Sequence, residues 1–256
     1  MLDYNSLTNR QGLIVWGGES STDYGMVVAE APAFDKPTKR TEVFTVPGRN
    51  GAVLFQDGSF DDVTRSYKVW IAEDESVDSG GNVNGTLAER VSAITAWLYS
   101  QQGYTRLEDN FEPDIFRLAY YSGENDISNE LTQYGETTLS FTCRPERFYK
   151  DAETAVAVAN GDTITNPTKF ASKPLIKITA AGTVTVGIAG VSIVAVVTDY
   201  IYIDCERMNA YRLTSENKND KISGSFPTIR PGTNAISISV TGTLTKVEIT
   251  PRYFSI

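Results

Sequence analysis

Residues 43–55 have the sequence VFTVPGRNGAVLF, and the rest of the chain is organised around this stretch. Two β-prone runs flank a Pro-Gly-Arg-Asn-Gly connector, which is typical of a β-hairpin with a longer loop. Pro47 fixes φ at the corner of the turn, and Gly48 and Gly51 can adopt positive φ without strain. The pattern therefore predicts a hairpin that presents Arg49 at its tip. A surface hairpin with an incidental cation is the alternative interpretation.

The composition favours strands over helices. The chain has 256 residues, of which 41% are hydrophobic and 21% charged, and it contains 13 tyrosines and 11 phenylalanines. A chain of this length can form one large domain or two ordinary ones, and its apolar content is sufficient for a buried core. Aromatic and β-branched residues are enriched in strands. We therefore expect a mainly β protein.

The net charge of −9 is distributed unevenly along the chain. Residues 1–150 hold 13 basic and 23 acidic residues, whereas residues 151–256 hold 10 basic and 9 acidic residues. This break suggests two domains with different surroundings. No basic patch is present to grip nucleic acid, although an acidic surface can face nucleic acid that must slide past without sticking.

Periodicity predicts one helix and several strands in the first half. Apolar residues recur at helical spacing over 86–100, where Thr86 has the character of an N-cap and Glu89 follows at the capping-box spacing. Apolar and polar side chains alternate over 64–72, which predicts a strand with one buried face. Further strands are expected at 13–16, 26–28, 104–108, 116–121 and 137–143. The acidic, glycine-containing segment 73–86 lacks the ligand spacing of a calcium loop, so we interpret it as a solvated loop.

The second half is predicted to be an all-β sandwich. The composition shifts to Ala, Val, Thr and Gly near residues 145–155, so we place the domains at 1–148 and 149–256. A turn is expected at Ala181-Gly182 between two short strands. The expected strands are 175–178, 183–188, 192–197, 200–205, 235–240 and 246–249.

The sequence offers little material for catalysis. It contains no histidine, which removes the usual general base and the commonest zinc ligand. Cys143 and Cys205 lie in strand-like runs and are expected to be buried free thiols. The Gly187–Gly190 segment has no following helix and does not match a phosphate-binding loop. We therefore predict no enzyme activity, no cofactor and no metal site.

Two weaker alternatives depend on particular side chains. The carboxylate pairs Asp61-Asp62 and Asp199/Asp204 are candidates for glycoside hydrolysis, although acids near turns are usually only solvated. A carbohydrate-binding host-adhesion module is the other alternative, because exposed aromatics on β-sandwiches bind sugars. The tyrosines that could serve are Tyr200, Tyr202, Tyr211 and Tyr253, and packing is the competing interpretation for them.

The order of motifs resembles a known family. In the first half the motifs are Asp23-Tyr24-Gly25, Val46-Pro47-Gly48-Arg49-Asn50-Gly51, Trp97-Leu98 and Phe141-Thr142-Cys143-Arg144-Pro145. This series resembles the N-terminal domain of siphophage distal tail (Dit) proteins. The C-terminal domain of that family is matched more weakly, by Tyr202-Ile203-Asp204-Cys205-Glu206, Phe226-Pro227, Pro231-Gly232-Thr233-Asn234 and Ile249-Thr250-Pro251-Arg252-Tyr253.

The resemblance implies both a fold and a function. The implied fold is an N-terminal β-sandwich or split barrel with one α-helix, followed by a galectin-like β-sandwich. The implied function is a homo-hexameric ring in the virion tail, which joins the tail tube protein to the tail-associated or tail-tip protein. In some phages the ring also holds receptor-binding proteins, and DNA passes through its channel. The first residues have neither a basic start nor an apolar core, so we expect no signal peptide and no membrane association. The subunit-interface candidates are Pro47, Gly48, Arg49, Asn50 and Gly51.

Overall fold

The computed structural model describes residues 12–34, 36–72, 87–123, 128–131, 134–213 and 216–256. The chain divides into two compact units. Residues up to Arg147 form unit 1, together with the last residue, and Phe148–Ser255 form unit 2. Strands dominate both units, and the described residues include one α-helix. The predicted fold class, mainly β with a single helix, is confirmed.

Unit 1 is built on a twisted antiparallel sheet, with the strand order β2-β1-β7-β8-β10-β6-β3. The longest pairing is between β6 and β10, in which Tyr67 lies opposite Leu139. Period-2 alternation places Tyr67, Val69 and Ile71 on the buried face, as the sequence predicts. The strands are β1 (Ile14–Trp16), β2 (Glu19–Ser20), β3 (Met26–Val28), β6 (Val63–Ala72), β7 (Thr105–Asp109), β8 (Ile115–Tyr121), β9 (Ser128–Leu131, paired with β10) and β10 (Tyr134–Tyr149).

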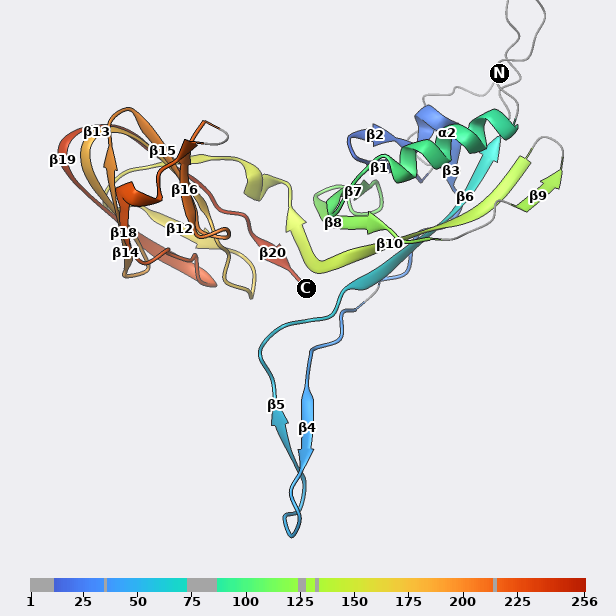
Figure 1. Cartoon of the computed structure of the whole chain (residues 1–256), viewed down its shortest axis with the longest axis horizontal. Coiled ribbons are helices and arrows are strands. Elements are labelled where there is room, and N and C mark those ends of the chain that lie inside the picture. The colour runs from blue at the N-terminus through green and yellow to red at the C-terminus, as the bar shows by residue number, and fades with distance from the viewer. Residues whose placement is uncertain (1–11, 35, 73–86, 124–127, 132–133, 214–215) are drawn as a thin grey trace, which may run out of the picture. The chain divides into compact units, whose positions relative to one another are not determined.

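Helix α2 (Leu87–Tyr99) contributes to the core of unit 1 (Figure 1). Its buried residues are Leu87, Ile94, Trp97 and Leu98. Trp97 Nε1 donates a hydrogen bond to the carbonyl oxygen of Trp16 in β1, at 3.1 Å, and its ring stacks on Tyr24 in the short 3-10 helix η1 (Ser21–Tyr24). The helix therefore lies where periodicity predicts it. The proposed N-cap Thr86 and the 73–86 loop lie outside the described residues.

Strands β4 (Glu42–Thr45) and β5 (Ala52–Phe55) form a separate two-stranded sheet (Figure 1). The pairing is antiparallel, with Val43 opposite Leu54 and Phe44 opposite Val53. Every residue of both strands is exposed. The hairpin predicted from residues 43–55 therefore forms, but it makes no contribution to the core of unit 1.

Unit 2 contains a second antiparallel sheet, with the path β11-β19-β13-β15-β16-β17. Strands β12 and β14 pair with β19 and β13 respectively, and β18 pairs with β14. Its aliphatic core includes Ile176, Val186, Ile203 and Ile249. The elements are η2 (Asp151–Glu153), β11 (Val156–Val158), β12 (Thr163–Asn166), β13 (Leu175–Ile188), β14 (Val191–Val197), β15 (Tyr200–Asp204), β16 (Asn209–Arg212), β17 (Glu216–Asn217), η3 (Asn219–Lys221), β18 (Ile222–Gly224), β19 (Gly232–Thr250) and β20 (Phe254–Ser255).

Two predicted breaks in the strands are wrong. The turn at Ala181-Gly182 does not exist, because β13 continues through Gly182 and pairs there with Gly242 of β19. A Cβ built on Gly182 would lie 2.1 Å from the carbonyl oxygen of Thr241, so glycine is required by the close approach of two backbones and not by a turn. Strand β10 likewise continues beyond Cys143, through Pro145, to Tyr149.

Candidate functional site: the projecting hairpin and its base

The β4–β5 hairpin exposes large apolar side chains on both of its faces. Directly opposed residues share a face, and successive residues alternate between faces. Val43 and Leu54 therefore lie on one face, with exposed fractions of 62% and 60%. Phe44 and Val53 lie on the other face. A lone two-stranded hairpin is marginally stable in water, and clustered exposed apolar side chains mark interaction surfaces.

The tip of the hairpin has the conformation that its sequence predicts. Gly48 and Gly51 both have φ of 79°, a value that a residue with a Cβ rarely adopts. The amide of Arg49 donates to the carbonyl oxygen of Val46 at 3.2 Å, which closes the turn. All five interface candidates, Pro47 to Gly51, are exposed. The Arg49 side chain has no partner among the residues that the structure describes.

A polar stem connects the hairpin to unit 1. Lys39 and Phe60 form an isolated antiparallel bridge. Next to it, Arg40 Nε donates to Asp61 Oδ1 at 2.7 Å, although both side chains are more than half exposed. Such an exposed pair contributes little stability, about 0.2–1 kcal/mol. The stem therefore aligns the two chains without fixing them rigidly.

The base of the hairpin is held by a buried polar network around Arg65. Its Nε and Nη2 atoms donate to Asp109 Oδ2 at 3.1 and 2.8 Å, and Tyr67 Oη donates to the same oxygen at 2.7 Å. Arg65 Nη1 reaches the carbonyl oxygen of Ala33 at 3.4 Å. Ala33 precedes the hairpin and Arg65 follows it, so this one guanidinium contacts both chains that lead into the arm.

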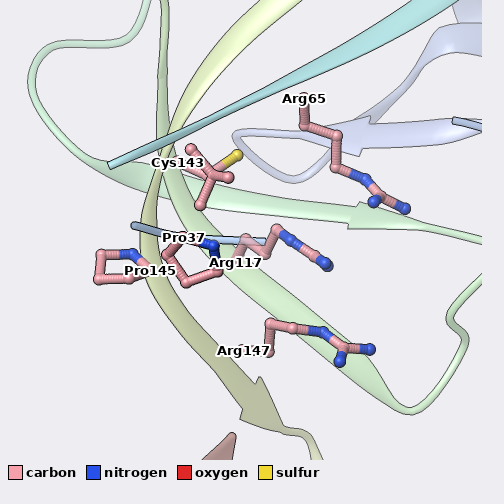
Figure 2. A pocket seen from close by; sticks show the side chains of 7 residues that line it. Pro37, Arg65, Arg117, Cys143, Pro145 and Arg147 are labelled. Carbon is pink, nitrogen blue, oxygen red and sulfur yellow. The ribbon is translucent and has the colours of Figure 1, made fainter. Parts of the chain in front are cut away.

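The network continues to a second carboxylate, Glu112. Arg117 Nη1 lies 2.8 Å from Glu112 Oε2, Arg65 Nη2 lies 3.2 Å from the same oxygen, and Arg147 pairs with Oε1. Figure 2 shows the three arginine side chains extending in the same direction, with Cys143 set apart from their guanidinium groups. The adjoining cavity of about 10 Å³ has room for about one water molecule. It is too small for a substrate, so this network is a structural clamp.

Burial and charge together set the protonation states of the network. Burial raises the pKa of Tyr67, and the nearby Asp109 carboxylate raises it further, so Tyr67 stays neutral and donates its proton. Burial raises the pKa of Asp109, but the charge of Arg65 and the hydrogen bond from Tyr67 outweigh it, and the net shift is downward. Burial lowers the pKa of Arg65, and its partners Tyr67 and Asp109 reverse that shift. The result is an ionised pair with a neutral tyrosine.

The other groups that could carry out chemistry are separately engaged. Cys143 and Cys205 are buried free thiols, and burial raises the pKa of Cys205 to about 12, so it stays protonated. Asp62 accepts a hydrogen bond from Tyr104 Oη, Asp199 pairs with Arg212, and Asp204 pairs with Arg252. The described residues contain no cluster of His, Cys, Asp or Glu that could hold a metal ion, and no helix among them is both long and apolar enough to cross a membrane.

Three of the four tyrosines considered for sugar binding lie together. The rings of Tyr202 and Tyr211 stack with centroids 5.4 Å apart, and the Tyr200 ring meets Tyr202 edge-on at 5.9 Å. Lys177 Nζ lies 5.4 Å from the centroid of Tyr202. Tyr253, in contrast, is buried in the core of unit 2. The ring faces of the group are thus largely occupied by one another and by cations.

Comparison with known proteins identifies the class of protein. Residues 22–143 match the family model of the phage tail protein RIFT-related domain. The solved structure of the Dit protein of phage SPP1, described as a paradigm of the hub adsorption apparatus in phages that infect Gram-positive bacteria, matches with a TM-score of 0.71 and 14% sequence identity. The match covers 96% of this chain and 99% of the SPP1 chain. The sequence has no significant match among curated proteins.

Unit 1 therefore contains a phage tail protein domain, and the matched range includes the hairpin and most of the Arg65 network. The likeness to SPP1 Dit extends the shared fold over nearly the whole chain. The chain is a siphophage Dit-like tail protein, as its motif order indicates.

The sequence reasoning missed the Arg65 network. Asp109, Glu112 and Arg117 lie in a short stretch between two expected strands, but nothing in that stretch indicates that Arg65, more than forty residues earlier, meets them. The apolar side chains of the hairpin were available as a signal. Both alternating positions of β4 and β5 are apolar, and such a pattern in a short hairpin indicates two contacted faces.

Proposed function

We propose that this protein forms a hexameric ring at the distal end of a non-contractile phage tail. The ring joins the tail tube protein to the baseplate or tail-tip proteins and leaves a channel for DNA. Residues 1–148 close the ring, and residues 149–256 form the galectin-like domain that meets further tail proteins, including receptor-binding proteins. The observation that carries this proposal is the hairpin, which exposes apolar side chains on both faces within the matched tail domain.

The occupant assigned to the hairpin is a second copy of this chain. Both of its faces need apolar contact, and its tip presents the cation Arg49. Residues 1–150 carry a net charge of −10, so the same region of a neighbouring copy offers acidic partners to that cation. A guanidinium binds a carboxylate through two parallel hydrogen bonds, which makes Arg49 a suitable contact.

The charge distribution also supports a channel for DNA. An acidic lumen repels phosphates and lets DNA pass, whereas a basic lumen would retain it. The excess of acidic residues falls in residues 1–150, the part of the chain that is proposed to close the ring.

The decisive test is the mass of the purified full-length protein, by light scattering, together with negative-stain microscopy of the same fraction. Six-fold rings with a central hole are expected, either from the protein alone or after addition of the tail tube and tail-associated proteins. Monomers under both conditions would refute the ring.

A matched pair of variants tests the role of the hairpin. Leu54→Ser replaces an exposed leucine of β5 and is expected to reduce ring formation, because it removes apolar area from the interface. Leu213→Ser replaces a leucine of unit 2 with a similar exposed fraction, 63% against 60%, and serves as the control. Equal loss of rings in both variants would show that general solubility changes, and not the hairpin, control assembly.

The alternative from the sequence, a carbohydrate-binding module, rests on the tyrosine group of unit 2. Because these rings pack on one another and against Lys177, the contacts favour packing over an open sugar platform. A glycan array probed with the full-length protein tests this alternative. Binding of a neutral wall polysaccharide, abolished by Tyr202→Ala, would establish it.

A further inference from the structure

A cavity of about 240 Å³ lies at one end of unit 2. It is formed where the β14–β15 connection, the end of β16 and η3 come together. The buried side chains of Val197 and Ile201 and the ring of Tyr200 give it apolar walls. Pockets for drug-sized ligands range upward from about 300 Å³, so this cavity is suited to a smaller molecule. The ring function proposed above has no use for it.

The lining of this cavity is positively charged. Arg212, Lys218 and Lys221 line it, and none of its lining residues is acidic. Each cation has one carboxylate partner outside the lining: Arg212 pairs with Asp199 at 2.6 Å, Lys218 with Glu216 at 2.5 Å and Lys221 with Asp220 at 2.9 Å.

These ion pairs are weak enough to be exchanged. The side chains of Asp199, Glu216 and Asp220 are 54%, 42% and 67% exposed, and exposed pairs contribute about 0.2–1 kcal/mol each. An anion inside the cavity would meet three cations against an apolar wall, where charge-assisted hydrogen bonds are stronger than in open water.

Arg212 offers a donor that the protein leaves unused. Its Nη2 donates to Asp199, and its guanidinium carbon lies 5.1 Å from the centroid of the Tyr200 ring. Its Nε is enclosed and has no hydrogen-bond partner. An enclosed donor without an acceptor costs about 1–3 kcal/mol, which a bound anion would recover.

We propose that this cavity binds a small organic anion, with one carboxylate or phosphate carried on a body about the size of a single sugar ring. The anionic group lies among Arg212, Lys218 and Lys221. The body packs against Tyr200, Val197 and Ile201.

Isothermal titration calorimetry of the full-length protein tests the proposal with four probes: glucuronate, glucose 6-phosphate, glucose and inorganic phosphate. At least one of the two anionic sugars is expected to bind with a millimolar dissociation constant, and about tenfold more tightly than glucose or inorganic phosphate. Comparison of glucuronate with glucose 6-phosphate then decides between a carboxylate and a phosphate.

Two lysine variants locate the binding. Lys221→Gln is expected to weaken binding of the preferred anionic sugar about fivefold or more. Lys246→Gln removes a lysine that is equally exposed, 49% against 47%, and likewise paired with an acid, but lies outside the cavity, so it should leave binding unchanged. The proposal is overturned if neither anionic sugar binds, if Lys221→Gln has no effect, or if inorganic phosphate binds as tightly as glucose 6-phosphate.

Discussion

Arg65 and Asp109 form a buried ion pair in which two guanidinium nitrogens donate to a single carboxylate oxygen, Oδ2, at 3.1 and 2.8 Å. Their side chains are 2% and 4% exposed. The other carboxylate oxygen, Oδ1, accepts hydrogen bonds from the backbone amides of Phe111 and Glu112. Asp109 thereby connects the base of the hairpin to the turn between β7 and β8.

Asp109→Asn should destabilise unit 1 by about 3 kcal/mol, because breaking a buried pair leaves a charge without its compensating partner. All three tryptophans, Trp16, Trp70 and Trp97, lie in unit 1, so urea denaturation followed by tryptophan fluorescence reports on this unit. Asp61→Asn breaks the exposed pair with Arg40 and is the control, with an expected loss below about 1 kcal/mol. Equal losses in the two variants would contradict the role given to the clamp.

Unit 1 should lose stability in acid. The pKa of Asp109 is lowered in the folded protein, because Arg65 and Tyr67 outweigh the effect of burial, and the unfolded value is about 3.9. A depressed folded pKa contributes stability above the unfolded pKa, which is lost as the pH falls through the folded pKa. Urea titrations between neutral pH and about pH 3 should therefore show falling midpoints below about pH 4. In Asp109→Asn this slope should be shallower, and an unchanged slope would assign the acid sensitivity to other groups.

Gly182→Ala should destabilise unit 2 far more than Gly190→Ala. Both glycines have positive φ, but a Cβ on Gly182 meets the carbonyl oxygen of Thr241 at 2.1 Å, whereas a Cβ on Gly190 has no neighbour within 4 Å. We expect a loss of about 1 kcal/mol for Gly190→Ala, from backbone strain alone. For Gly182→Ala we expect about 3 kcal/mol or more. Denaturation followed by circular dichroism measures both, and similar losses would mean that the two strands separate at low cost.

Arg49→Ala should weaken assembly without changing the stability of the monomer. A charge-assisted contact contributes about 1.5–3 kcal/mol, so the dissociation constant for subunit association should rise about tenfold or more. Sedimentation of the variant at several concentrations measures this change. Arg230→Ala, which removes an exposed arginine of unit 2, is the control. If Arg49→Ala assembles as well as the parent protein, the tip does not contact a neighbouring subunit.

Local patterns in the sequence predicted the regular elements well. The helix over 86–100 is observed at Leu87–Tyr99, and the alternating run 64–72 is observed as β6, because one-sided burial imposes a period of 3.6 or 2 on the residues concerned. The glycines of the hairpin tip were likewise readable, since positive φ is a local property of the backbone.

Patterns that depend on distant neighbours were misread or missed. Gly182 was interpreted as a turn because a lone glycine has the same local signature in a turn and in a close approach of two strands. The extension of β10 beyond Cys143 was missed because Pro145, which lacks an amide hydrogen, normally ends a strand. In both cases the partner strand decided the outcome.

The sequence by itself determined the elements, the hairpin with its cationic tip, and the family resemblance, since each depends on residues close together in the chain. Only the tertiary structure decided that Arg65 meets Asp109 and Glu112, and that Arg212, Lys218 and Lys221 line one cavity. The physical reason is that buried polar groups and clustered charges are defined by their neighbours in space. Those neighbours are brought together by strand pairing between segments that carry no local record of one another.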